Sequence, residues 1–194
     1  MKPWQAGAAP VLIFALGIAA LLAMEYILKR RQPEKIDLAA DQGSLKFIAN
    51  SRNASFLIAI ASTFFPLVTL PGSRDCHLLA GSGVIYAGLL LRGWAIAMLG
   101  PWFTNVVALQ ADQKLVTRGP YRHIRHPGYA GGLMFFLGLG IATGSICGLA
   151  LIMVVMFYAF RRRILVEEKA MLAAFGPEYQ AYMQRTKKLI PMIY

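Results

Sequence analysis

Two polar segments in the carboxyl-terminal half of the chain hold most of the side chains that could bind a ligand or take part in a reaction. The first, residues 113–129, is basic, contains two histidines and is interrupted by two Gly/Pro turn signals. The second, residues 161–168, places Arg163 and Glu167 four residues apart, so that they share one helix face. An arginine can hold a carboxylate with two hydrogen bonds, and a glutamate suits an amine or a hydroxyl group. The same residues have a simpler explanation: the three arginines at 161–163 would fix the orientation of a membrane span, and Glu167 and Glu168 would face solvent.

Two other chemistries have weaker support. His123 and His126 could bind a metal, but only one other histidine exists, neither cysteine is near, and Pro127 prevents a helical ligand pair. We therefore expect no metal site. The glycines of residues 138–144 are spaced loosely like a dinucleotide loop, but the segment lies in an apolar run with no strand before it. Packing of helices through small residues explains these glycines better.

The composition indicates a membrane protein. Among 194 residues, 57% are hydrophobic and only 15% are charged, against about 25% charged in a soluble domain. The mean hydropathy is +0.53. These values exclude an ordinary soluble fold, a coiled coil and a disordered chain, and two cysteines exclude a disulfide framework.

Four apolar runs, at 10–28, 54–70, 78–100 and 128–160, must position the polar segments. A membrane helix needs about 17–25 apolar residues, so the first three runs are predicted to be single spans. As one helix the fourth would be about 50 Å long, which exceeds a hydrocarbon core of about 30 Å. We therefore predict a hairpin that turns near Gly144-Ser145.

The distribution of positive charge supports this hairpin. With five helices, 17 Lys and Arg residues fall on one side of the membrane and 2 on the other, whereas four helices give 10 and 9. The positive-inside rule favours five, with the N-terminus outside and the C-terminus in the cytoplasm. This orientation accounts for the net charge of +11 without a nucleic-acid partner. The expected fold is an all-α integral membrane protein, with a three-span region at 1–100 and a loop, hairpin and C-terminal helices at 101–194.

Charged and cysteine side chains inside the spans need their own explanation. Arg92 and Glu25 both fall in the inner halves of their helices, so we predict that they pair. Cys76 and Cys147 both fall near the outer face, where a disulfide is possible if their Cα atoms approach within about 7 Å.

The C-terminal tail is predicted to fold against the membrane. Gly176-Pro177 ends one helix and begins another. Tyr179, Tyr182 and Met183 lie on one face of that second helix.

The motif from Arg125 to Gly131, Arg-His-Pro-Gly-Tyr-Ala-Gly, is separated by 35 residues from Glu167-Glu168. This pair of motifs resembles the signature of the isoprenylcysteine carboxyl methyltransferases, whose wider group includes membrane phospholipid methyltransferases. The resemblance extends upstream to residue 105 and downstream through Leu189-Ile190-Pro191.

The resemblance implies S-adenosyl-L-methionine as methyl donor and the carboxylate of a lipid-modified cysteine as acceptor, at a pocket on the cytoplasmic face. Arg163 would face the acceptor carboxylate, which needs no general base because it is already ionised at neutral pH. Two positions depart from the family pattern, since Gln113 stands where many relatives have His and Gly128 where many have Ser. The residues that would line the cofactor pocket are Gln113, Lys114, Leu115, Val116, Tyr121, His126, Pro127, Gly128, Tyr129 and Glu167.

Three alternatives remain open. A phospholipid N-methyltransferase would need Glu168 or a histidine as base, because its amine acceptor must lose a proton. A sterol-type membrane reductase would need a nicotinamide dinucleotide. A transporter or a non-catalytic lipid-binding scaffold would need no cofactor, and the sequence has no evident inverted repeat of the kind typical of transporters.

Overall fold

The computed structural model describes residues 6–30, 41–65, 67–104 and 113–189, and in these ranges the regular elements are all helices. Residues 105–112, Ile190 and Pro191, which belong to the resemblance, lie outside the described residues, as does most of the first predicted loop. The helices are α1 (Ala8–Arg30), α2 (Ser44–Phe64), α3 (Arg74–Leu99), η1 (Gly100–Trp102), η2 (Gly119–Arg122), α4 (Pro127–Thr143) and α5 (Ile146–Arg185).

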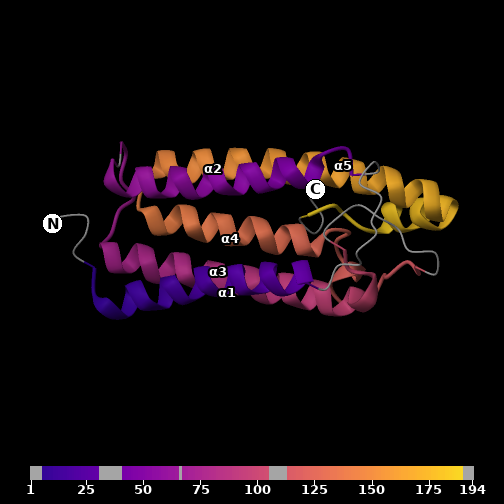
Figure 1. Cartoon of the computed structure of the whole chain (residues 1–194), viewed down its shortest axis with the longest axis horizontal. Helices are drawn as coiled ribbons and strands as arrows, with labels where there is room; N and C mark the ends of the chain where they lie inside the picture. Colours follow the sequence, from indigo (N-terminus) through magenta and orange to yellow (C-terminus); the bar gives the residue numbers. More distant parts are fainter. Residues whose placement is uncertain (1–5, 31–40, 66, 105–112, 190–194) are drawn as a thin grey trace.

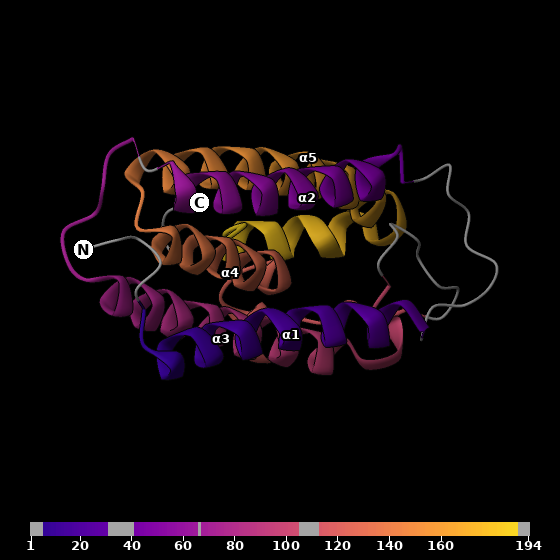
Figure 2. The same cartoon turned by 60° about the vertical axis from the view of Figure 1, so that its left-hand side comes forward.

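The five α-helices run roughly side by side in one bundle (Figures 1 and 2). Helices α2 and α5 form one layer, α1 and α3 form another, and α4 lies between them and packs against both α3 and α5. The loop of residues 113–126 and the final part of α5 gather at the end of the bundle where α3 finishes and α4 begins. All polar segments singled out above therefore meet at one end.

The predicted hairpin is confirmed. Helix α4 ends at Thr143, and Gly144 takes a left-handed conformation with φ of 71°. Glycine adopts this conformation without a Cβ penalty, so it ends the helix sharply. The side chain of Ser145 then accepts a hydrogen bond of 3.2 Å from the backbone N–H of Gly148 and caps the start of α5.

Helices α3 and α4 touch through their backbones. A Cβ atom on Gly138 would lie 2.4 Å from the carbonyl oxygen of Gly81, and a Cβ on Gly88 would lie 2.6 Å from the carbonyl oxygen of Gly131. Contacts this short leave room only for hydrogen at these positions, as expected for helices that associate through small residues. The packing interpretation of the glycines in 138–144 is confirmed for Gly138.

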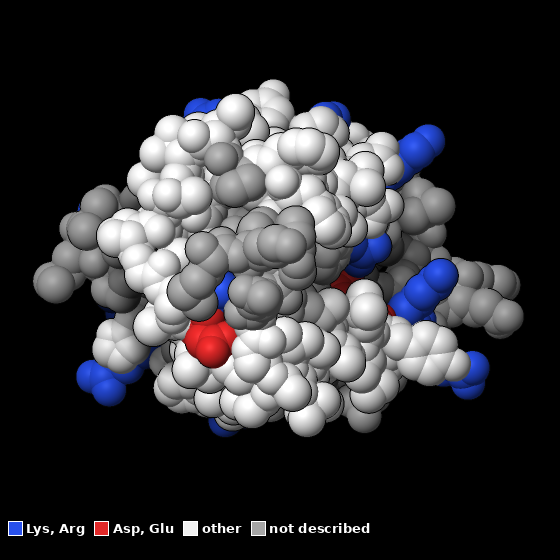
Figure 3. Space-filling model, turned by 90° about the vertical axis from the view of Figure 1, so that its left-hand side faces the viewer, with Lys and Arg blue, Asp and Glu red and all other residues white. Residues whose placement is uncertain are grey.

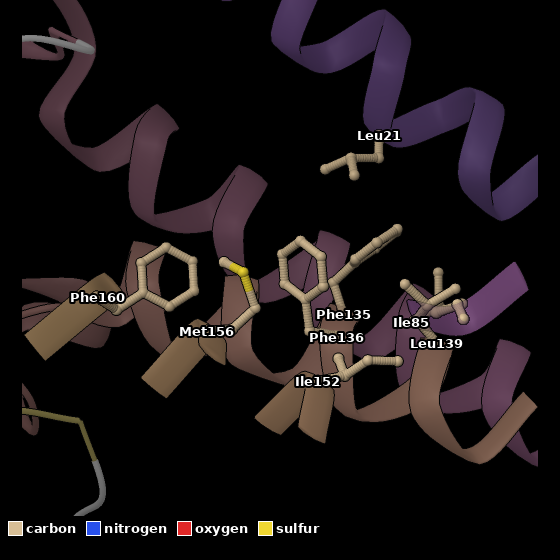
Figure 4. Packing of buried hydrophobic residues seen from close by; sticks show 9 residues of the cluster. Leu21, Ile85, Phe135, Phe136, Leu139, Ile152, Met156 and Phe160 are labelled. Atoms are coloured by element: carbon tan, nitrogen blue, oxygen red, sulfur yellow. The ribbon is translucent and has the colours of Figure 1, made fainter. Parts of the chain in front are cut away.

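The interior of the bundle is apolar and aromatic (Figure 4). Phe135 and Phe136 of α4 pack edge to face, with ring centroids 5.3 Å apart, and Ile152 and Met156 of α5 are fully buried. The outer faces are also apolar, since Leu90 keeps 75% of its surface exposed. Such a surface suits lipid and not water.

Two of the described helices are long and apolar enough to cross a membrane, namely Ala8–Arg30 and Arg74–Trp102, the second continuing α3 through η1. Helix α4 is apolar but shorter. Figure 3 looks onto the end of the bundle at which α1 begins and α4 ends, and most described atoms on this end are uncharged.

The predicted bounds of the second span were wrong. Helix α2 begins at Ser44, ten residues before the predicted start, and ends at Phe64 instead of residue 70. Polar side chains before position 54 find partners on other helices of the bundle: Ser44 Oγ accepts a hydrogen bond of 2.6 Å from Arg163 Nη1 of α5, and Arg52 Nη1 lies 3.7 Å from Glu25 Oε2 of α1. A prediction from hydropathy leaves such polar residues out of the helix, because it does not include the contacts that they make with other helices.

The remaining expectations about the chain are resolved as follows. The break at Gly176 is confirmed, because this residue has φ of 49° and ψ of −122° inside α5. Tyr179 and Tyr182, which were predicted to share one helix face beyond this break, are both buried. Cys76 and Cys147 are both free thiols, so the possible disulfide does not form.

Candidate active site

The loop before α4 is attached to the C-terminal tail by backbone hydrogen bonds. The N–H groups of Arg125 and His126 donate to the carbonyls of Lys187 and Lys188 at 2.8 and 3.0 Å. Burial raises the pKa of Tyr182 to about 12, so its hydroxyl stays protonated and donates to the carbonyl of Tyr121 at 2.7 Å. Segments about 60 residues apart in the sequence therefore form one wall.

Glu168 is the centre of a buried ionic cluster in this wall. Its Oε1 accepts a hydrogen bond of 2.9 Å from Arg125 Nε and lies 3.4 Å from His126 Nε2, while Lys188 Nζ lies 3.2 Å from Oε2. Burial alone would raise the pKa of Glu168, but hydrogen bonds from His126 and Arg125 and the positive charge of Arg125 lower it to about 2. The carboxylate is therefore ionised at neutral pH and holds Arg125 and His126 in position.

Glu167 points in a different direction and contacts the first motif through Tyr129. The Tyr129 hydroxyl donates to Glu167 Oε2 at 2.6 Å and accepts from Arg163 Nε at 3.2 Å. The Tyr129 ring packs against the rings of His126 and Phe160, with centroid distances of 5.7 and 5.4 Å. The predicted contact between the loop and the tail is thus present at the level of side chains.

Arg163 is almost fully buried. Its Nη1 contacts a carboxylate oxygen of Asp41 and donates to Ser44 Oγ at 2.6 Å. The Asp41 carboxylate also accepts from the backbone N–H of Leu45 at 2.9 Å, in the first turn of α2. The guanidinium therefore joins α5 to the start of α2 while remaining in contact with Tyr129.

Tyr129, Arg163 and Glu167 line a cavity of about 610 Å³. Pro127 does not line it, because it is buried at the first position of α4 and sets the start of that helix. All other predicted site residues line the cavity: Gln113, Lys114, Leu115, Val116, Tyr121, His126, Gly128, Tyr129, Arg163 and Glu167.

The cavity has a polar part and an apolar part. Its apolar part is lined by aromatic and aliphatic side chains from all five α-helices, among them Leu21, Phe56 and Phe135 (Leu21 and Phe135 are labelled in Figure 4). A ligand with a polar head and a hydrocarbon tail matches this division.

The predicted pair of charges, Glu25 and Arg92, is confirmed, and a third charged residue, Arg52, joins it. Arg92 Nη2 lies 3.1 Å from Glu25 Oε1, and Arg52 Nη1 lies 3.7 Å from Glu25 Oε2. All three residues line the cavity. The sequence prediction missed Arg52 and Asp41. The only signal for Arg52 is that it stands four residues before Phe56, on the same helix face.

Residues 76–178, more than half of the chain, match the sequence model of the phospholipid methyltransferase family. The chain therefore belongs to this family.

Comparison with individual proteins shows which members of this family the chain resembles. The chain is 30% identical over 145 residues to the protein-S-isoprenylcysteine O-methyltransferase of Schizosaccharomyces pombe, a match that covers 74% of this chain and 61% of the yeast protein. It is 27% identical over 199 residues to a probable protein-S-isoprenylcysteine O-methyltransferase of Oryza sativa subsp. indica, covering 97% of this chain and 100% of that protein. The resemblance inferred from the motifs is confirmed by these relatives.

A solved structure shares the fold. The eukaryotic intramembrane Ras methyltransferase, an isoprenylcysteine carboxyl methyltransferase, superposes with a TM-score of 0.68 at 24% sequence identity, over 98% of this chain and 70% of that one. At 24% sequence identity, this match shows only that the two proteins share an arrangement of helices.

Proposed function

We propose that this protein transfers a methyl group from S-adenosyl-L-methionine to the C-terminal carboxylate of a prenylated cysteine, forming a methyl ester. The observation that carries the proposal is a continuous cavity in which Glu167, Tyr129 and His126 lie at the polar end and aromatic side chains line the other end. A polar donor and a lipid-linked acceptor can meet in such a space. The names of the relatives above support the same chemistry.

The residues at the polar end fit this donor. Glu167 supplies carboxyl oxygens suited to the amino group or the ribose hydroxyls, and Leu115, Val116 and Tyr121 form an apolar wall suited to adenine. A volume of about 610 Å³ is in the usual range for sites that enclose a small molecule, about 300–1,000 Å³. We propose that the donor is held by these residues together with Gln113, Lys114, His126, Gly128 and Tyr129, and that Pro127 acts by fixing the start of α4.

When bound, S-adenosyl-L-methionine supplies a methyl group on a positively charged sulfur. The chain itself supplies orientation and a dry environment. The acceptor carboxylate is ionised at neutral pH, so the protein needs no base, and we propose that Arg163 faces this carboxylate from α5. Holding the reacting groups in line accounts for up to roughly 7–11 kcal/mol of the barrier in favourable cases. Phe135, Phe136 and Phe160 line the adjoining wall and exclude water from it.

We further propose five transmembrane helices, with the N-terminus outside, the site on the cytoplasmic face, and the catalytic parts concentrated in residues 101–194. The charge distribution and the mostly uncharged end of the bundle in Figure 3 support this orientation. Reporter tags inserted before α4 and after α5 should both be found in the cytoplasm. Tags in opposite compartments would refute this membrane topology.

The decisive experiment is a labelled-methyl assay on the purified protein, with farnesylcysteine and phosphatidylethanolamine as parallel acceptors. We expect label in a base-labile ester of farnesylcysteine, and loss of that signal in Glu167→Ala. Label in phosphatidylethanolamine alone would favour phospholipid N-methylation, the second candidate suggested by the description of the matching family. Transfer to neither acceptor, by a protein that binds the donor in calorimetry, would overturn both candidates. Binding of a nicotinamide dinucleotide in place of the donor would indicate a reductase.

A further inference from the structure

The carboxylate of Asp41 is buried just before the start of α2. Its side chain is 4% exposed, as is that of Arg163, with which it forms an ion pair. Arg163 belongs to the lining of the cavity, whereas Asp41 does not. Asp41 therefore contacts Arg163 from outside the cavity and does not occupy the space in which an acceptor would lie.

The first turn of α2 holds this carboxylate in place. Oδ2 of Asp41 accepts a hydrogen bond of 2.9 Å from the backbone N–H of Leu45, and Oδ1 accepts one of 3.1 Å from the hydroxyl of Ser44. The positive end of the helix dipole also favours an anion at this position. The negative charge of Asp41 is therefore shared between α2 and Arg163, and does not act on the guanidinium alone.

The guanidinium group of Arg163 is attached at two of its nitrogens. Nη1 contacts Asp41 and donates to Ser44 Oγ at 2.6 Å, while Nε donates to the Tyr129 hydroxyl at 3.2 Å. Because the guanidinium is planar, contacts at two nitrogens fix its orientation. The Tyr129 hydroxyl donates in turn to Glu167 at 2.6 Å, so one series of contacts runs from the start of α2 to the proposed donor end of the cavity.

A buried ion pair of this kind is not explained by stability alone. Removing two charges from water is costly, and apolar side chains of similar volume often give equal or greater stability. The pair of Asp41 and Arg163 is explained if the reaction needs the positive charge of Arg163 at a fixed place. A displacement of about 1 Å in a group that orients a substrate can cost about 100-fold in rate.

We propose that Asp41 is a positioning residue, which fixes the guanidinium of Arg163 from outside the cavity so that Arg163 binds the acceptor carboxylate in the reactive geometry. The proposal rests on the proposed function and makes it more specific. It assigns a part in acceptor recognition to the start of α2, which lies outside the residues that match the family model.

The test compares two ligands that differ only at the anion, farnesylcysteine and its carboxamide. Three constants are measured for the wild-type chain and for Asp41→Ala: the Michaelis constant of the acid, the inhibition constant of the amide and the dissociation constant of S-adenosyl-L-methionine. The control is Asp75→Ala, the same substitution at a carboxylate that accepts from the backbone N–H of Gly7 and does not line the cavity.

We expect the wild-type chain and the control to prefer the acid by about 10- to 150-fold, the range for a hydrogen bond to a charged group. Asp41→Ala should lose most of this preference through a higher Michaelis constant for the acid. The inhibition constant of the amide and the affinity for the methyl donor should stay unchanged, because neither ligand uses the contact between Arg163 and the acceptor carboxylate.

The outcomes separate the two proposals. If the wild-type chain methylates and prefers the acid, and Asp41→Ala keeps the full preference, the assignment of Asp41 is wrong and the proposed function stands. The same holds if the wild-type chain methylates the acid without preferring it to the amide. If the wild-type chain does not methylate farnesylcysteine, the proposed function fails and the assignment falls with it.

Two other results would also overturn the assignment. A lower Michaelis constant for the acid in Asp41→Ala would show that Asp41 competes with the acceptor for Arg163. Equal weakening of the acid, the amide and the methyl donor would show that Asp41 has only a structural role.

A double variant shows whether Asp41 acts through Arg163. In an Arg163→Met chain the guanidinium is absent, so the additional change Asp41→Ala should leave the Michaelis constant of the acid as it is in Arg163→Met. A further increase as large as that in the wild-type background would overturn the proposal.

Should Asp41→Ala fail to fold, Ser44→Ala decides. This variant keeps the carboxylate but removes one acceptor of Arg163 Nη1 and the hydroxyl that donates to Asp41. It should reduce the preference for the acid about fivefold, as expected for one neutral hydrogen bond. An acid preference of wild-type size in Ser44→Ala would overturn the assignment.

Discussion

Replacing Glu168 by glutamine should destabilise the protein by about 3–5 kcal/mol, the usual cost of removing one partner from a buried ion pair. The side chains of Glu168 and Arg125 are 7% and 6% exposed, so water cannot take the place of the lost charge. Glutamine keeps the shape of the side chain but leaves Arg125 and Lys188 without a carboxylate. Since these contacts join the loop before α4 to the C-terminal tail, the wall of the cavity should loosen as well.

The pKa of Glu168 leads independently to a similar magnitude. The carboxyl has a pKa of about 2 in the folded protein against an ordinary value of 4.5, which corresponds to about 3 kcal/mol. This stabilisation is complete above pH 4.5. It is lost as the pH falls from 4.5 toward 2, because the unfolded chain then takes up a proton that the folded chain does not bind. A Glu168→Gln chain lacks the carboxyl group and therefore cannot show this acid-dependent loss of stability.

The assay is thermal unfolding of the detergent-solubilised protein, at pH 7 and at several values down to pH 3. At about 2–4 °C per kcal/mol for a chain of this length, Glu168→Gln should unfold roughly 6–20 °C below the wild-type chain at pH 7. Its melting temperature should also depend less on acid. The matched control is Glu178→Gln, an exposed glutamate of the same helix. A Glu168→Gln protein with the melting temperature and acid dependence of the wild-type chain would refute the buried network.

Three further predictions concern the site and the helix packing. Glu167→Gln should weaken binding of S-adenosyl-L-methionine by about 10- to 150-fold in calorimetry, because a hydrogen bond to a charged group is worth about 1.5–3 kcal/mol, and it should leave the melting temperature unchanged; unaltered affinity would contradict the role of Glu167. Tyr129→Phe keeps the ring but removes the hydroxyl between Glu167 and Arg163, so donor affinity should fall about fivefold, as expected for about 1 kcal/mol, and an equal affinity would show that the hydroxyl is dispensable. Gly138→Ala should lower the free energy of unfolding by about 1–3 kcal/mol, because its Cβ would lie 2.4 Å from a backbone oxygen of α3. The control is Gly83→Ala, whose Cβ would have no atom within 4 Å, and this variant should not destabilise the bundle. Equal melting temperatures for the two variants would rule out the close contact at Gly138.

Hydropathy and motif spacing predicted much of this protein from the sequence. The uncharged run at 128–160 is too long for one span, and its turn at Gly144-Ser145 is where the structure has it. The motifs at 125–131 and 167–168 identified the family. These predictions succeed because each depends on properties of neighbouring residues: the length of an apolar run, the conformational freedom of glycine and the spacing of residues within a motif.

Other features required the tertiary structure, because they depend on side chains that are distant in the sequence. Asp41 contacts Arg163 across 122 positions, and Arg52 reaches Glu25 only because α2 extends back to Ser44. The polar start of α2 is helical because other helices of the bundle provide partners for its side chains. An average of hydropathy over neighbouring residues contains no information about those distant partners.

The adjacent pair Glu167 and Glu168 illustrates the same limit. The sequence indicates that the two side chains point about 100° apart on a helix, but not which of them faces the cavity. Only the packing of α5 against α4 and the return of the tail to the loop decide this. They direct Glu167 to Tyr129 and bury Glu168 beside Arg125 and Lys188. Secondary structure follows from local chemistry, whereas the function of each charge depends on which distant group the fold brings within a few ångströms.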